Sequence, residues 1–212
     1  MKATRICLVR HGETTWNAEK RIQGQIDIGL NSAGLAQAEA AARWLSGQPV
    51  AALYSSDLLR ARQTAERIAM QLRLQPHFLA EFRERRYGFF EGLTYDESRA
   101  RYPAEYQLFE TREPAFVIPF GGESLQQLHE RVATALSRLA LRHGGQTIVV
   151  VTHGGVLDIV NRLARGNALS IPRDFLIPNA GINWVVGDGQ AWRLQAWGET
   201  AHLNEFGLDE LP

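Results

Sequence analysis

The chain has 212 residues, of which 45% are hydrophobic and 22% charged, and this composition is typical of a soluble globular protein with one domain and a sizeable core. Its 23 basic and 23 acidic residues balance, which argues against nucleic acid or an anionic membrane surface as a partner. The single cysteine, Cys7, excludes an internal disulfide and a cysteine-based zinc cluster.

The first half of the sequence alternates short apolar runs with helical patterns. The expected elements are a strand over 4–10, a loop over 11–31 with one helical turn near Thr15–Glu19, a helix over about 32–46, a strand over Val50–Tyr54, a helix after Ser55-Ser56-Asp57 and a weak strand over Pro76–Leu79. Asn31-Ser32 supplies an N-cap for the first helix, and Asp57 with the two serines before it is expected to cap the second.

The segment over 81–123 differs from the rest of the chain because aromatic and charged residues dominate it. Its chain breakers are Pro103, Pro114, Pro119 and the pair Gly121-Gly122. Short helices are expected near 94–101 and 103–111. We interpret this segment as an insertion or lid between regular β-α units, and not as a separate domain.

Regular patterns return after the insertion. The expected elements are a helix over about 124–143, a strand over Thr147–Thr152, a helix that opens near Val156, and two late strands over Ile182–Val186 and Trp192–Trp197 joined by a Gly187-Asp188-Gly189 turn. The continuous apolar run of Thr147–Thr152 implies a strand that is buried on both faces.

This order of elements predicts an α/β fold with three layers, α/β/α. We expect a mainly parallel central sheet flanked by helices, with a lid-like insertion over about 81–123, in a single domain that spans residues 1–212. In such sheets, ligands bind just beyond the carboxyl ends of the strands. Residues that follow the strands are therefore the first candidates for a functional site.

Two of the predicted strands end in the same way. The first strand is followed by Arg10-His11-Gly12, and the strand over Thr147–Thr152 by His153-Gly154-Gly155. Both histidines should therefore lie at one edge of the sheet. Arg60, early in the helix after the second strand, should reach the same edge. Glycines allow close approach of backbone N–H groups to a ligand, and arginine suits bidentate binding of phosphate. The pattern indicates a cationic site for a phosphate dianion, with His11 as the candidate nucleophile.

Other uses of these histidines fit the sequence less well. A histidine at the end of a strand is usually a surface or hydrogen-bonded residue, and only the repeated pattern favours a site. A metal site would need nearby carboxylates or a third histidine at ligand spacing, and His77, His129, His143 and His202 do not provide it. The glycine-rich motifs of nucleotide-binding loops are also missing. We therefore expect neither a metal nor a cofactor.

The sequence resembles the histidine phosphatase superfamily, which includes the cofactor-dependent phosphoglycerate mutases. The blocks that carry the resemblance follow the family's order along nearly the whole chain. They are Leu8-Val9-Arg10-His11-Gly12-Glu13-Thr14, Asn17 with Arg21-Ile22-Gln23-Gly24-Gln25, Ser55-Ser56-Asp57-Leu58-Leu59-Arg60-Ala61, Phe82-Arg83-Glu84-Arg85-Arg86-Tyr87-Gly88, Gly121-Gly122-Glu123-Ser124 and Val151-Thr152-His153-Gly154.

The resemblance implies a role for each matching position. His11 would accept the phosphoryl group as a phosphohistidine, and Glu84 would be the general acid and base. Phosphate would be bound by Arg10, Asn17, Arg60, His153 and the N–H of Gly154. Gln23, Gly24 and Tyr87 would lie near the substrate. From its charged surroundings alone Glu84 would be a solvated residue, and the spacing to Tyr87-Gly88 singles it out. Arg85 and Arg86 are expected to be solvated or to pack under the lid.

Phosphatases and mutases of this family share the phosphohistidine and differ in what receives the phosphoryl group. The arginines of the insertion, Arg99, Arg101 and Arg112, are singly spaced and do not form the pair that holds a second acidic group in the mutases. The Gly121-Gly122-Glu123-Ser124 block also resembles the phosphatase branch. The sequence Glu84-Arg85-Arg86-Tyr87-Gly88, in contrast, is close to that of a mutase. We favour a histidine acid phosphatase-type phosphomonoesterase that acts on a small phosphorylated metabolite. A cofactor-dependent phosphoglycerate mutase is the alternative, and a non-catalytic phospho-ligand-binding module ranks third.

Partners and location follow from composition and from what the sequence lacks. The N-terminal apolar run is too short for a secretory signal, and the aliphatic run over Ile148–Val151 is far too short to span a bilayer, so we expect a cytoplasmic protein. The expected partner is the small phosphorylated substrate, with no nucleic acid and no membrane. A homodimer through the late strands or the tryptophan-bearing C-terminal stretch stays open.

Overall fold

A computed structural model describes residues 2–203 of the protein. The strands are β1 (Thr4–Arg10), β2 (Val50–Ser55), β3 (Pro76–Phe78), β4 (Thr147–Thr152), β5 (Ile182–Gly187) and β6 (Trp192–Glu199). The α-helices are α1 (Thr15–Ala18), α2 (Ser32–Leu45), α3 (Leu59–Leu72), α4 (Tyr95–Arg101), α5 (Pro103–Glu110), α6 (Leu125–Arg142) and α7 (Gly154–Arg165). These bounds agree with the expected elements to within a few residues.

The six strands form one sheet in the order β3-β2-β4-β1-β5-β6. Strands β1 to β4 pair in parallel, and β5 and β6 are added as antiparallel neighbours. In the pairing of β1 with β4, Arg10 lies opposite Thr152, so the two central strands end at the same level of the sheet. The prediction of a mainly parallel sheet is confirmed.

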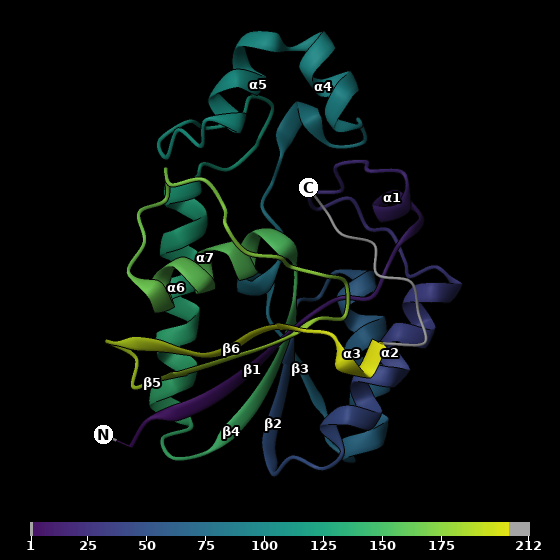
Figure 1. Cartoon of the computed structure of the whole chain (residues 1–212), viewed down its shortest axis with the longest axis vertical. Coiled ribbons are helices and arrows are strands. Elements are labelled where there is room, and N and C mark those ends of the chain that lie inside the picture. The colour runs from purple at the N-terminus through teal and green to yellow at the C-terminus, as the bar shows by residue number, and fades with distance from the viewer. Residues whose placement is uncertain (1, 204–212) are drawn as a thin grey trace.

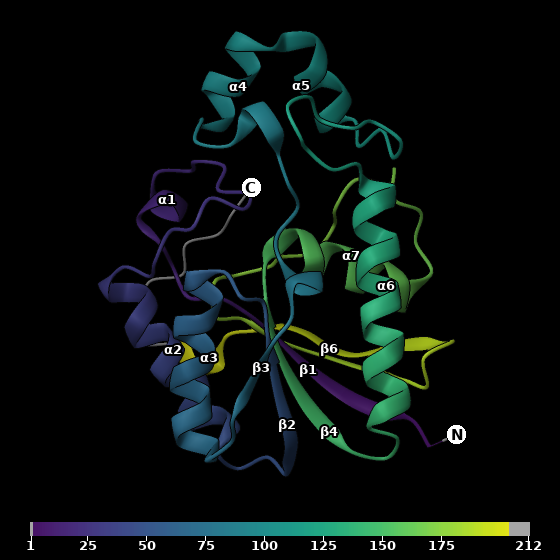
Figure 2. The same ribbon diagram turned by 180° about the vertical axis from the view of Figure 1, so that it is seen from behind.

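Helices cover both faces of the sheet, with α6 and α7 on one face and α2 and α3 on the other (Figures 1 and 2). Alternate residues of each central strand serve the two layers. Ile6 and Leu8 of β1 pack with the α6–α7 layer, and Cys7 and Val9 pack with the α2–α3 layer. Each fully buried aliphatic side chain contributes about 1.5–3 kcal/mol relative to an exposed one. The predicted three-layer α/β/α fold is confirmed.

The expected cap of α3 is wrong in one respect, because Asp57 does not cap the helix. Its carboxylate instead accepts two hydrogen bonds from the Arg83 guanidinium, at 2.7 and 2.6 Å. The first amides of the helix find other acceptors: the N–H of Leu58 donates to Ser56 Oγ at 3.3 Å and the N–H of Leu59 to Asp27 Oδ1 at 2.6 Å. A paired guanidinium is the stronger partner for a carboxylate, and the local sequence contains no sign of it.

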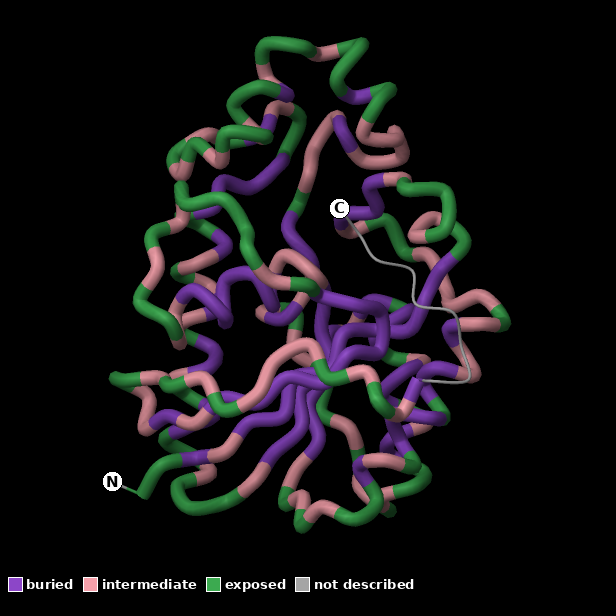
Figure 3. Tube along the Cα trace, viewed as in Figure 1, coloured by how far each residue is buried: buried purple, intermediate pink, exposed green. Residues whose placement is uncertain are grey.

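The insertion carries α4 and α5, which stand away from the sheet beyond its carboxyl edge (Figure 1). Most of its aromatic side chains pack against one another around Phe90 and Tyr106, in a cluster apart from the two main core layers. The rings of Phe89 and Tyr102, for example, lie 4.0 Å apart. The aromatic residues therefore hold the insertion together, and much of the remaining trace around α4 and α5 is exposed (Figure 3).

Candidate active site

The histidines that follow β1 and β4 meet at the carboxyl edge of the sheet. The ring centroids of His11 and His153 are 5.1 Å apart, and both side chains are buried. Parallel pairing of the two strands brings them together, since Arg10 and Thr152 are opposite each other in the register. The structure thus gathers at one edge the two residues that the repeated sequence pattern singled out.

His11 is held in one protonation state and one tautomer. Its Nδ1 lies 2.7 Å from the carbonyl oxygen of Gly12, which can only accept, so Nδ1 carries the ring proton and Nε2 keeps its lone pair. Burial lowers the pKa of His11 well below its usual value, and the nearby Arg60 and Arg10 guanidinium groups lower it further. A neutral imidazole with a free Nε2 is a competent nucleophile.

Two buried arginines supply the positive charge of the site. Arg10 Nη1 donates to the carbonyl oxygen of Ile177 at 2.5 Å. Arg60 donates from Nη1 to Ile26 O at 3.0 Å and from Nη2 to Gly24 O at 2.7 Å. Burial lowers the pKa of each guanidinium to about 10, so both remain charged at neutral pH. Backbone carbonyls fix these cations, and within residues 2–203 none of the side-chain hydrogen bonds of Arg10 and Arg60 goes to a carboxylate.

His153 faces Ser56 from the neighbouring strand end. Its Nε2 lies 2.7 Å from Ser56 Oγ, which also accepts the N–H of Leu58. The serine can therefore give its own proton to Nε2, and the ring proton of His153 then sits on Nδ1 as a donor. Burial, followed by the charge of Arg60, lowers the pKa of His153 well below its usual value, so this ring is neutral as well.

Several buried polar atoms at this edge lack a protein partner. Among the described residues, the buried side-chain atoms without a hydrogen bond include Arg10 Nε, Arg60 Nε, His153 Nδ1 and Gln23 Oε1. Leaving such an atom unsatisfied costs about 1–3 kcal/mol, so groups of this kind call for an explanation. Donors gathered on two cations and a neutral ring match the oxygens of a phosphate group. The Gln23 oxygen is an acceptor and suits a hydroxyl or ammonium donor.

Glu84 lies at the N-terminus of α7. Both oxygens of its carboxylate are 3.1 Å from the N–H of Gly155, and Oε1 also accepts the N–H of Arg85 at 2.7 Å. Glu84 Oε2 and Arg10 Nε lie 3.8 and 3.9 Å from the point where Gly154 would carry a Cβ atom, so the acid and the cation are neighbours. The first turn of α7 thus fixes the position of the Glu84 carboxyl group.

Asn17 is oriented by two other side chains. Its Oδ1 accepts from the N–H of Thr14 at 3.1 Å, from the Thr14 hydroxyl at 3.0 Å and from Asn179 Nδ2 at 3.3 Å. With its oxygen occupied in this way, Asn17 has its amide nitrogen left as a donor. Asn179 also donates to the carbonyl oxygen of His11 at 3.1 Å, so it ties the two predicted site residues together.

Gly24 and Tyr87 border the site in different ways. Gly24 has a φ of +52° and offers its carbonyl to Arg60, so it positions a cation. Tyr87 lies beside the acid, since its hydroxyl is 3.5 Å from the point where Gly155 would carry a Cβ atom. Burial and the charge of Glu84 raise the pKa of Tyr87 well above its usual value, so the hydroxyl keeps its proton.

Sequence reasoning missed several residues at this edge. They are Ser56 as the partner of His153, Asn179, and Arg173, whose charge acts on Arg10 and Tyr95; Gly155 was expected near the site, but not its hydrogen bond to Glu84. Arg85 is buried under the insertion, with its guanidinium 5.7 Å from the Tyr87 ring and 5.9 Å from the Phe109 ring, whereas Arg86 is exposed. Neither a metal-binding cluster of His, Cys, Asp and Glu side chains nor a helix fit to cross a bilayer occurs within residues 2–203.

Comparison with known proteins identifies the family. The family model described as histidine phosphatase superfamily (branch 1) matches residues 6–200. The chain belongs to the histidine phosphatase superfamily. The resemblance found in the sequence motifs is thus confirmed over nearly the whole length, and the homologous enzymes named below are phosphatases or mutase-like proteins.

Two similar proteins come from Arabidopsis thaliana. Phosphoglycerate mutase-like protein 4 is 43% identical over 206 residues, which cover 96% of this chain and 88% of that protein. A metal-independent phosphoserine phosphatase is 40% identical over 212 residues, which cover 98% of this chain and 86% of that protein. Among solved structures, a phosphoserine phosphatase from Entamoeba histolytica in complex with 3-phosphoglyceric acid superimposes with a TM-score of 0.85 at 30% identity, over 94% of this chain and 99% of that one.

The close contact between Gly155 and Glu84 yields a first prediction, because the Glu84 carboxylate occupies the space that a side chain at position 155 would need. A Cβ at this position would lie 2.3 Å from Glu84 Oε1, so Gly155→Ala must push the carboxylate away. We expect kcat/KM on an alkyl phosphomonoester to fall about 10- to 100-fold, while alanine maintains or raises the thermal midpoint because it favours helix. Gly47→Ala, where a Cβ meets nothing within 4 Å, is the control. Full activity in Gly155→Ala would contradict this geometry.

The neutral state of His11 yields a second prediction, on stability against pH. An unfolded histidine has a pKa near 6.5, so below about pH 6.5 the unfolded chain binds a proton that folded His11 does not. The free energy of unfolding should therefore fall with decreasing pH, by up to about 1.4 kcal/mol per pH unit for this histidine. Urea unfolding between pH 7 and 5 should show a shallower dependence of the unfolding free energy on pH for His11→Asn, by a difference that approaches about one proton near pH 5. Equal slopes would mean that His11 is protonated in the folded state.

Proposed function

We propose that the protein is a phosphomonoesterase that hydrolyses a small phosphorylated metabolite through a phosphohistidine on His11. The observation that carries the proposal is the state of His11, a neutral ring whose Nε2 has its lone pair available beside two buried cations. Glu84, bound at the N-terminus of α7 and adjacent to Arg10, is the proposed general acid and base. Family membership supports both assignments.

The proposed first step transfers the phosphoryl group to the protein. The Nε2 lone pair of His11 attacks phosphorus while the bond from phosphorus to the ester oxygen breaks, and the proton of Glu84 passes to the leaving alkoxide. Arg10, Arg60, His153 and Asn17, with the N–H of Gly154, meet the charge that spreads over the phosphoryl oxygens. This work is mainly positioning and electrostatic stabilisation, for which a preorganised buried site is suited.

The proposed second step returns the protein to its starting state. Glu84, now a carboxylate, takes a proton from water as the water oxygen attacks phosphorus, and the bond from phosphorus to Nε2 breaks. Inorganic phosphate leaves with His11 neutral and Glu84 protonated again. No metal or cofactor enters either step, in keeping with the name of the metal-independent phosphatase that is 40% identical.

Charges around the site favour a substrate with a second anionic group. Arg85 is buried and lies beside Glu84 and Tyr87. This cation is not needed to hold a phosphate that is bound by Arg10 and Arg60. Phosphoserine and 3-phosphoglyceric acid, named for two of the similar proteins, both carry a carboxylate. We therefore propose a small phosphorylated acid, with Gln23 and Tyr87 near its non-phosphate end.

The mutase alternative rests on the 43% identity to a phosphoglycerate mutase-like protein. The insertion argues against it, because two of its arginines are engaged within the chain. Arg99 pairs with Glu110 at 3.0 Å, and Arg112 pairs with Asp158 at 2.5 Å. They do not form the adjacent pair that would hold the acidic end of a second phosphorylated substrate. Water is then the favoured acceptor of the phosphoryl group.

A substrate panel tests the reaction and its preferred esters. With EDTA present, we expect phosphate release from phosphoserine or 3-phosphoglycerate at least about 10-fold faster, in kcat/KM, than from glycerol 3-phosphate, which has no carboxylate. Isomerisation of 3-phosphoglycerate, assayed in parallel, should be slower than release. Isomerisation that far outruns release would identify a mutase. Binding of orthovanadate without turnover of any ester would identify a non-catalytic module.

Trapping the intermediate tests the nucleophile. A brief reaction with a ³²P-labelled substrate, stopped in alkaline detergent, should leave label on the protein that is stable to base and released by acid, as expected of a phosphohistidine. His11→Ala should abolish this label and lower kcat by at least about 1,000-fold. His129→Ala, a histidine of α6, is the matched control and should label normally. Label that persists in His11→Ala would refute the assignment.

A further inference from the structure

The stretch that bears Glu84 has no regular secondary structure of its own. Residues 83–87 run between two short 3₁₀ turns, Ala80–Phe82 and Gly88–Phe90, and belong to no helix or strand. Backbone N–H and C=O groups that are removed from water need partners, and helix or sheet ladders normally supply them. In this stretch the partners must come from elsewhere in the chain, and they decide where Glu84 sits.

Most of the backbone carbonyls around Glu84 accept hydrogen bonds from side chains or N–H groups that lie outside the stretch. Thr152 Oγ1 donates to the carbonyl oxygen of Phe82 at 2.9 Å, and Gln25 Nε2 donates to that of Glu84 at 3.0 Å. The remaining contacts converge on two residues. Arg131 Nη1 donates to the carbonyl oxygens of Glu81 at 2.6 Å and Arg83 at 3.0 Å.

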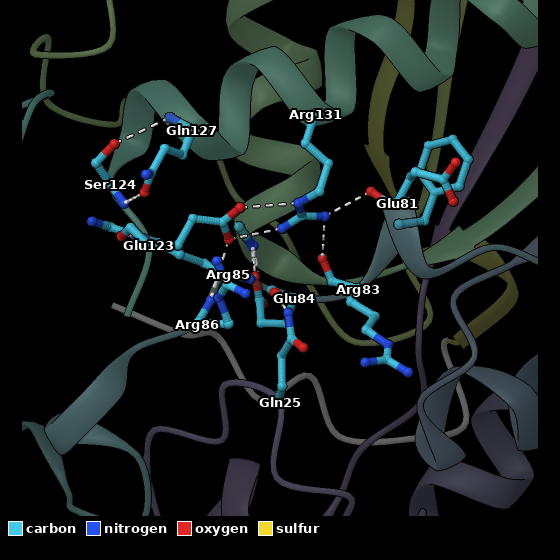
Figure 4. Close-up of polar contacts among 12 residues, drawn as sticks. Gln25, Glu81, Arg83, Glu84, Arg85, Arg86, Glu123, Ser124, Gln127 and Arg131 are labelled. Carbon is cyan, nitrogen blue, oxygen red and sulfur yellow. Dashed lines mark hydrogen bonds and ion pairs between the residues drawn. The ribbon is translucent and has the colours of Figure 1, made fainter. Parts of the chain in front are cut away.

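Glu123 is the second of these two residues, and it binds the stretch on the other side of Glu84. Its N–H donates to Arg86 O at 2.9 Å, and its carbonyl oxygen accepts from Arg85 Nε at 2.8 Å. Its carboxylate accepts from Arg131 in a fork, Nε to Oε1 at 3.0 Å and Nη2 to Oε2 at 2.8 Å. We call this pair the Glu123–Arg131 clamp; Figure 4 shows it with the bound peptide units around Glu84.

The clamp stands on a rigid support. Arg131 belongs to α6, and Glu123 directly precedes Ser124, which closes a capping box with Gln127 at the start of that helix. The side chain of Glu123 is only 4% exposed, so its charge depends on Arg131 for compensation. Arg131, fixed on α6, thus binds backbone carbonyls on the N-terminal side of Glu84. Glu123 binds Arg85 and Arg86 on the C-terminal side of Glu84.

Arginine is required at this position by its shape and not by its charge alone. The guanidinium of Arg131 uses Nε and Nη2 for the carboxylate and Nη1 for two carbonyls, which is a planar arrangement of donors. A lysine ammonium would keep the charge, but it could not bind both oxygens of the Glu123 carboxylate and also donate to the carbonyls of Glu81 and Arg83. Arg138, two turns further along α6, offers a contrast because it binds the exposed side-chain carboxylate of Glu81 and no backbone group.

We propose that Glu123 and Arg131 are positioning residues that place the Glu84 carboxylate for proton transfer. Among the described residues they make no hydrogen bond or ion pair with His11, and they reach Glu84 through the backbone of residues 81–86 and through Arg85, whose N–H binds Glu84 Oε1. The inference rests on the proposed role of Glu84 as general acid. Loosening the clamp then weakens protonation of the leaving group and leaves phosphoryl capture by His11 unchanged.

The decisive test uses two esters that differ in their need for a proton. Phosphoserine leaves as an alkoxide and requires an acid, whereas 4-nitrophenyl phosphate has a stable phenolate leaving group. For Arg131→Lys and for Glu123→Gln, kcat/KM on phosphoserine should fall about 10- to 100-fold, while kcat/KM on 4-nitrophenyl phosphate stays within about threefold of the wild type. We use kcat/KM because it reports the steps up to departure of the leaving group. Arg138→Lys is the matched control and should match the wild type on both esters.

A double-mutant cycle with Glu84→Gln separates positioning from general support of the fold. If the clamp acts through Glu84, Arg131→Lys adds no further loss on phosphoserine once Glu84 is replaced. Equal losses on both esters, or a full additional loss in the Glu84→Gln background, would overturn the proposal. Glu123→Gln serves in the same cycle if Arg131→Lys lowers the thermal midpoint. A wild-type protein that hydrolyses neither ester would refute the proposed function itself, which is a different result.

Discussion

Burial of two guanidinium groups at the carboxyl edge of the sheet is the constraint on which the rest of the site depends. Arg10 and Arg60 are 3% and 1% exposed, so little of their surface meets bulk solvent. Backbone carbonyls hold them in place, and burial lowers the pKa of each to about 10, which still leaves both charged. Burial, together with these positive charges, lowers the pKa of His11 and His153, and the donors left over suit the multiply charged anion proposed as the substrate.

The same positive charges explain why the acid residue needs its own support. A carboxylate beside two cations would be drawn into an ion pair with them, which would prevent the proton donation proposed for Glu84. Glu84 is instead held by the N–H groups of Gly155 and Arg85, and its peptide neighbours are fixed from α6. Arg10 and Arg60 are thus bound by backbone carbonyls and Glu84 by backbone N–H groups, so the cations and the carboxyl group are held by separate parts of the chain.

Much of the fold and part of the site could be predicted from the sequence, because the signals are local. Alternating burial in β1 and β4, the caps at Asn31 and Ser124, and the histidines after two strands all lie within a few adjacent residues. The contributions of Asn179, Gly155 and Arg131 could not be predicted in this way. Each acts on a segment more than 40 residues away in sequence, through backbone groups that carry no residue-specific signal. The capping role expected of Asp57 failed for the same reason, since Arg83 lies 26 residues further along.

The reversed direction of β5 has a consequence for how this site can change. Because β5 runs antiparallel to β1, the chain enters it at the edge where β1 ends, and the residues that lead into it lie against His11. Ile177 and Asn179 thereby contact Arg10 and His11, and Arg173 lies a few residues earlier on the same connection. A parallel β5 would have brought this connection to the opposite edge. Substitutions in the lead-in to β5 can therefore displace Arg10 and His11 while the strands that precede the two histidines stay the same.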